Sequence, residues 1–193
     1  MNVKIIRTMA KFGTPSPVIG AIMILISISM TPGWSLSQPL SDLGSGGFGS
    51  VIFNNGLLMS GALSMLFAAG LFEFTKGDII GQVGSAAFLL FALATCGVGI
   101  VIIDLGVIHD QFATILFLMI PISSALISYN LYRRGLMRYA ALGIVALLFG
   151  VVPWALGGSV NAVKELIALI PFSIWYIMLG LYMYRLEEPS VFD

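Results

Sequence analysis

The chain has 193 residues, of which 59% are hydrophobic and only 9% are charged. Soluble domains carry about 25% charged residues, so this chain cannot cover a water-exposed surface and is predicted to lie in a lipid bilayer. Its formal net charge is zero and it has no basic block, so we expect no nucleic acid partner. Cys96 is the only cysteine, which excludes a disulfide within the chain. His109 is the only histidine, which excludes bis-histidine haem within one copy; we expect neither haem nor a nucleotide cofactor.

Apolar runs of about 20 residues predict six transmembrane helices, because a helix of that length crosses ~30 Å of hydrocarbon. Inside lipid, a single span satisfies its own backbone hydrogen bonds only as a helix. We therefore predict an all-α fold, a polytopic bundle of six transmembrane helices that forms one domain over residues 1–193. The predicted helices cover approximately residues 15–30, 50–74, 78–103, 108–132, 137–154 and 164–184.

The first apolar run has a second interpretation, a cleavable secretory signal. Basic residues precede a short apolar core from Val18 to Met30, and a small-x-small triplet follows at residues 35–37. Pro39 lies just past the possible cleavage site and argues against cleavage, so we predict a membrane helix here.

Lysine and arginine predict the orientation, because they are enriched in cytoplasmic loops. On the predicted topology, Lys164 is the only one on the side opposite the termini. The other eight share the side of the termini: Lys4, Arg7, Lys11, Lys76, Arg133, Arg134, Arg138 and Arg185. We therefore expect a multi-pass protein of the cell membrane with both termini in the cytoplasm, and with the loops after helices 1, 3 and 5 facing outward.

Polar residues that could form a site gather in these three outward loops. The first loop contains the segment SQPLSDLGSGG, residues 37–47, which is polar and rich in glycine. Loops at one end of a compact bundle are neighbours, so residues from all three could converge. The predicted ligand-binding residues are Ser41, Asp42, Asp104, His109, Asp110 and Glu165.

Two chemistries are open for such a site. Carboxylates and an imidazole could hold a divalent cation such as Zn²⁺ or Mn²⁺, which could activate water against a lipid headgroup ester. The candidate metal ligands are Asp42, His109, Asp110 and Glu165. Alternatively, His109 could act as a general base oriented by Asp110 or Asp104. The nucleophile would then be Ser37, Ser41 or Ser45, and the catalytic candidates are His109, Asp110 and Asp42.

A purely structural interpretation stands beside these chemistries. An acidic residue at a helix N-terminus is favoured by the helix dipole and can cap free N–H groups, which suits Asp110 and Glu165. Asp42 lies in Ser-Asp-Leu-Gly, a sequence typical of a turn. Neither an HExxH nor a GxSxG motif is present, so no spacing singles out one chemistry.

Four stretches resemble a prokaryotic family of small six-helix membrane proteins, the domain of unknown function numbered 998. They are PGWSLSQPLSDLG, FNNGLLMSGAL, HDQFATILFLMIPIS and ELIALIPFSIWYIMLGLY. The most specific pieces are Ser41-Asp42-Leu43-Gly44, His109-Asp110 and Glu165. The resemblance spans nearly the whole chain and implies the six-helix fold, but no activity, substrate or catalytic residue. It implies that these outer positions form the family's pattern, which favours a shared site over capping alone.

Three functions follow as hypotheses. The first is an outward polar pocket that binds, or also hydrolyses, a lipid headgroup or another amphiphile, with membrane lipids as partners and with or without a metal. The second is an accessory or scaffold subunit that packs against other membrane subunits or against itself. The third and weaker one is a small transporter, since the spans lack the mid-depth ionisable residues typical of an ion pathway.

Overall fold

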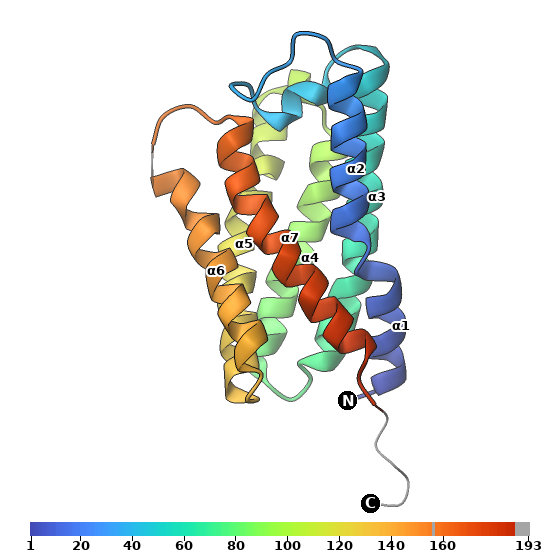
Figure 1. The fold of residues 1–193 in the computed structure, drawn as a ribbon, viewed down its shortest axis with the longest axis vertical. Coiled ribbons are helices and arrows are strands. Elements are labelled where there is room, and N and C mark those ends of the chain that lie inside the picture. Colours follow the sequence, from blue (N-terminus) through green and yellow to red (C-terminus); the bar gives the residue numbers. More distant parts are fainter. Residues whose placement is uncertain (156, 188–193) are drawn as a thin grey trace, which may run out of the picture.

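The computed structural model describes residues 1–155 and 157–187, and every regular element within them is a helix (Figure 1). Six stretches are long and apolar enough to cross a membrane. They are Val3–Ser29, Gly47–Phe74, Ile79–Ile100, Val107–Arg133, Met137–Ala155 and Ala162–Tyr184. The prediction of an all-α fold with six potential spans is therefore confirmed.

The first span consists of two helices, α1 (Val3–Gly13) and α2 (Ser16–Ser29). The sequence prediction began only at residue 15 and missed α1. Pro17 has no amide hydrogen, so it cannot donate to the carbonyl of Gly13 as the fourth residue of a continuous helix would. The hydroxyl of Tyr176 donates to that carbonyl instead, at 2.8 Å. A side chain from the last helix therefore satisfies the backbone group that the helix break frees.

The other five spans agree with their predicted ranges to within a few residues. They are α3 (Gly47–Phe74), α4 (Ile79–Ile100), α5 (Val107–Arg133), α6 (Met137–Ala155) and α7 (Ala162–Tyr184). Successive helices from α3 to α7 pack against each other, and α1 packs against both α3 and α7. Two short 3-10 helices, η1 (Leu40–Gly44) and η2 (Ile103–Leu105), lie in the connections α2–α3 and α4–α5.

The connections divide between two ends of the bundle (Figure 1). The end of the bundle with the connections α2–α3, α4–α5 and α6–α7 is called the upper end. The end with the N-terminus is called the lower end. All the predicted site residues lie at the upper end, as the sequence topology requires. They are separated from the lower end by an aromatic core in which Phe67, Phe88, Phe172, Trp175 and Tyr176 are buried.

Candidate functional site

The polar α2–α3 connection folds down onto the bundle instead of extending into solvent. Leu40 and Leu43 of η1 are buried and pack with Phe53 of α3 and Ala162 of α7. These apolar anchors fix the segment that contains Asp42, whose carboxylate accepts a hydrogen bond from the Gln38 side chain at 3.3 Å. The segment is therefore a packed part of the upper end.

Glu165 fastens this connection to the last helix. Its Oε2 atom accepts a hydrogen bond from the Leu40 amide at 2.6 Å, and the residue is only 8% exposed. The N-cap of α7 is Asn161, whose side chain accepts from the Lys164 amide at 3.1 Å. Glu165 thus bonds a distant backbone group, and capping of its own helix does not explain it.

A second polar contact joins the same connection to η2. The Ser45 hydroxyl lies 3.1 and 3.2 Å from the two carboxylate oxygens of Asp104, and both residues are on the exposed side of the upper end. This places the candidate nucleophile Ser45 against a carboxylate, whereas a nucleophilic serine would need a base such as His109.

His109 is 3% exposed and is bonded to the end of α4. Its Nδ1 atom lies 2.6 Å from the carbonyl oxygen of Val101. A carbonyl only accepts, so Nδ1 carries a hydrogen and donates it to Val101. Nε2 is buried and has no hydrogen-bond partner in the described part of the chain.

The predicted site residues therefore share one end but do not form one cluster. Asp110 is exposed, and within the described residues neither Ser37, Ser41 nor Ser45 is hydrogen-bonded to His109. In residues 1–155 and 157–187 no three His, Cys, Asp or Glu side chains lie together as a metal site requires. Neither the metal hypothesis nor the serine–histidine hypothesis finds its geometry there.

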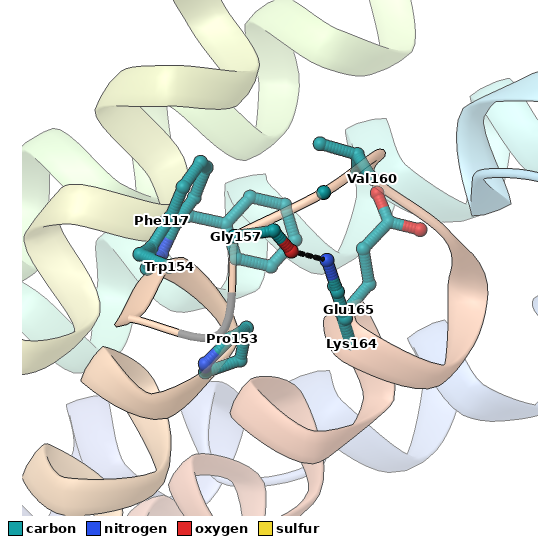
Figure 2. A pocket seen from close by; sticks show the side chains of 8 residues that line it. Phe117, Pro153, Trp154, Gly157, Val160, Lys164 and Glu165 are labelled. Atoms are coloured by element: carbon teal, nitrogen blue, oxygen red, sulfur yellow. Dashed lines mark hydrogen bonds between the residues drawn. The ribbon is translucent and has the colours of Figure 1, made fainter.

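A pocket of about 90 Å³ opens beside Glu165, between α5, α6, α7 and the connection that precedes α7 (Figure 2). Phe117 and Trp154 form an apolar wall, with their rings 5.8 Å apart. Lys164 and Glu165 supply the charged side chains that line it. This pocket contains only one of the six predicted site residues, Glu165.

Lys164 is the cation of this pocket. Its ammonium donates to the carbonyl of Gly157, as Figure 2 shows, and to that of Ser159 at 3.0 Å. Two of its three N–H groups are therefore used on neutral partners. It forms no ion pair with any described residue. The sequence analysis did not include Lys164 among the predicted site residues. Lys164 was, however, the only Lys or Arg predicted at this end, and that isolation was a signal that could have identified it.

A larger groove of about 380 Å³ lies close by, and it has only apolar side chains. Leu36, Phe149, Val163, Leu166, Ile167, Ile170 and Pro171 line it. Most of them belong to α7, where Val163 and Leu166 flank Lys164 and Glu165 in the chain. Hydropathy alone could not reveal the groove, because lipid-facing and groove-lining residues have the same composition.

Six apolar helices arranged as one bundle define a multi-pass helical membrane protein. The chain belongs to the family described as "Protein of unknown function (DUF998)", whose model matches residues 16–182. The resemblance read from the sequence is thereby confirmed, and α1 precedes the matched residues. No curated protein and no solved structure matches the chain.

Proposed function

We propose that this protein binds a membrane phospholipid between α6 and α7. The observation that carries the proposal is the juxtaposition on α7 of an apolar groove with a charged pocket, lined by consecutive residues from Val163 to Ile167. An amphiphile has the same arrangement of parts, a hydrocarbon chain next to a polar headgroup. Binding, without hydrolysis, is the activity that these residues support.

The groove suits a hydrocarbon chain. Its volume of about 380 Å³ falls in the range of ligand sites, roughly 300–1,000 Å³. It lies between two membrane-spanning helices, where acyl chains are the surrounding solvent. A chain that enters the groove leaves lipid and not water, so the hydrophobic effect does not favour it there, and its retention over neighbouring lipids comes from van der Waals contact with the groove's walls.

The pocket suits a phosphate-containing headgroup. The Lys164 ammonium has one N–H group that neither carbonyl uses and no ion pair with a described residue, and a phosphate oxygen would complement both its hydrogen and its charge. The carboxylate of Glu165 has a second oxygen that could accept from a hydroxyl or amine of the headgroup. Of the predicted site residues, we therefore retain Glu165 in direct contact and assign the α2–α3 connection, with Ser41 and Asp42, to its support.

The orientation in the membrane is part of this proposal. The lower end carries eight of the nine lysine and arginine residues, and the upper end carries Lys164. By the positive-inside preference, the lower end and both termini lie in the cytoplasm of a cell-membrane protein. The proposed headgroup pocket then faces outward, on the noncytoplasmic leaflet.

Lipid analysis of the purified protein tests the proposal. Lipids that remain bound after mild detergent extraction are identified by native mass spectrometry. Ile167→Trp should obstruct the groove and Lys164→Gln should remove the headgroup cation, and each should lower retention about tenfold or more. Leu90→Trp is the matched control, because Leu90 is an exposed apolar residue of α4 outside the groove.

Two outcomes would contradict the proposal. One is that the wild-type protein retains no defined phospholipid. The other is that Leu90→Trp lowers retention as much as Ile167→Trp does. Isolation of the protein with a fixed protein subunit and no lipid would instead support the scaffold hypothesis.

A further inference from the structure

The helix that the sequence prediction missed has three distinct faces. One face is buried against the bundle and consists of Val3, Ile6, Ala10 and Gly13. The packing is close, since a Cβ atom on Gly13 would lie 2.6 Å from the backbone nitrogen of Phe67 in α3. At the start of the helix, the Asn2 amide donates to Glu73 at 2.5 Å. Both ends of α1 are thus fixed on α3, and its outward faces have a defined direction.

The second face is a row of cations, Lys4, Arg7 and Lys11. At 100° per residue these positions fall within a sector of about 60°, so they form one stripe along the helix. All three are exposed. None forms an ion pair with a described residue, whereas Lys76, Arg133 and the N-terminal amine at the same end do. The stripe therefore has three charges within about 10 Å of helix length that no residue in 1–155 or 157–187 neutralises.

The third face is apolar and exposed. Ile5 and Phe12 are 43% and 51% exposed on the sector beside the cations. Measured from Ser29 at the upper end, a hydrocarbon layer of ~30 Å corresponds to about 20 helical residues and ends near Met9. Phe12 then lies against acyl chains, while Arg7 and Lys4 reach the headgroup layer and Lys11 can extend its side chain toward it.

We propose that this outward surface of α1, formed by Lys4, Arg7, Lys11, Ile5 and Phe12, binds the headgroups of anionic lipids. Its charge complements a phosphate-rich leaflet, and the Phe12 side chain matches the adjoining hydrocarbon. An acidic soluble protein would satisfy the cations but not the exposed Phe12 at the depth of the acyl chains. The surface lies at the lower end, opposite the Lys164 pocket, and does not depend on a ligand there.

The test compares two triple variants in nanodiscs that contain phosphatidylcholine with a small fraction of fluorescent phosphatidylglycerol. The first variant combines Lys4→Gln, Arg7→Gln and Lys11→Gln. The second, a control with the same charge change, combines Lys76→Gln, Arg138→Gln and Arg185→Gln, all exposed residues of the lower end. Native mass spectrometry reports the enrichment of phosphatidylglycerol.

The wild-type protein should enrich phosphatidylglycerol, and the α1 variant should lose about tenfold or more of that preference, since each cation contributes about fivefold. The control should lose less, because its three cations lie on separate elements and do not form one stripe beside an exposed apolar face. No preference in the wild type, or an equal loss in both variants, would overturn the proposal. The substituted side chains make no buried contact, so the fold should persist. If the triple variant does not purify, Arg7→Gln alone should still lower the preference about fivefold.

Discussion

The carboxylate of Glu165 accepts a hydrogen bond from the backbone amide of Leu40, which precedes it by 125 residues, at 2.6 Å. The bond connects the last membrane helix to the first upper connection, and both partners are buried. A backbone–backbone hydrogen bond, which the Ala162 amide donates to the Gln38 carbonyl at 2.8 Å, connects the same two segments. The upper end is therefore closed by contacts between the first upper connection and the last membrane helix.

Replacement of Glu165 should loosen this closure. Glu165→Ala leaves the Leu40 amide buried without an acceptor, which costs about 1–3 kcal/mol of unfolding free energy. Hydrogen exchange should become faster in residues 38–44, while exchange in the core of α4 stays unchanged. Glu165→Gln, which keeps a carbonyl acceptor, should show a smaller effect. Asp110→Ala is the control at an exposed acid, and equal exchange in the two alanine variants would contradict the assigned role.

Tyr176 should stabilise the break between α1 and α2. Tyr176→Phe removes the donor to the Gly13 carbonyl and leaves that carbonyl buried and unpaired, at a cost of about 1–3 kcal/mol. Thermal unfolding in detergent measures the loss. Tyr184→Phe deletes the hydroxyl of an exposed tyrosine of the same helix and should be neutral within about 0.5 kcal/mol. Similar melting temperatures for the two variants would disprove the assignment.

Two glycine substitutions should differ in severity because their neighbours differ. A Cβ atom on Gly61 would lie 2.4 Å from the Cys96 sulfur and 2.8 Å from the Ala92 carbonyl oxygen, so the α3–α4 backbones would have to separate. On Gly20 the nearest atom is the Ser60 hydroxyl at 3.1 Å, which can adjust. We expect Gly61→Ala to lower the free energy of unfolding by about 1–3 kcal/mol, and Gly20→Ala to lower it by less. The order of their melting temperatures checks this.

Protonation of Asp78 at low pH should reduce the stability of the folded protein at its lower end. Hydrogen bonding from the Gly81 amide at 3.0 Å, together with the Arg133 guanidinium at 2.9 Å, holds the pKa of Asp78 below its ordinary value of 3.8. A carboxylate whose pKa is lowered by folding contributes stability above its unfolded pKa, and that contribution is lost as pH falls through the lower folded pKa. Asp78→Asn should therefore lower the melting temperature at pH 7, and the difference from wild type should shrink toward pH 3. A difference that does not change with pH would contradict this.

The proposed orientation is testable with cysteine labels, because the native Cys96 is buried and should react slowly. Ser37→Cys places a thiol at an exposed position of the upper end, and Lys76→Cys places one at the lower end. A membrane-impermeant maleimide should label position 37 in intact cells and position 76 only after lysis. The reverse pattern would place the termini outside.

Hydropathy predicted the spans because burial in lipid depends on composition, which a single chain displays directly. It missed α1 because Lys4, Arg7 and Lys11 interrupt the apolar run. The spacing of Val3, Ile6 and Ala10 at i, i+3 and i+7 was the signal of a helix with one buried face.

The polar site was harder to predict for a different reason. The sequence indicates correctly that Glu165 and His109 lie at one end, but each of them bonds to a backbone group, Leu40 and Val101 respectively. Every residue offers the same backbone groups, so no pattern of side chains identifies such partners. The groove likewise depends on how far α6 and α7 separate, which composition does not encode.

The contact between Glu165 and Leu40 also orders the biosynthesis of the protein. The ribosome delivers Leu40 and the α2–α3 connection well before α7, so the Leu40 amide lacks its carboxylate acceptor while the middle helices enter the membrane. Only the insertion of the last helix supplies the carboxylate that fastens it. The α2–α3 connection therefore completes its hydrogen bonds only after α7 has inserted, and a chain that stalls before α7 leaves the Leu40 amide without its acceptor.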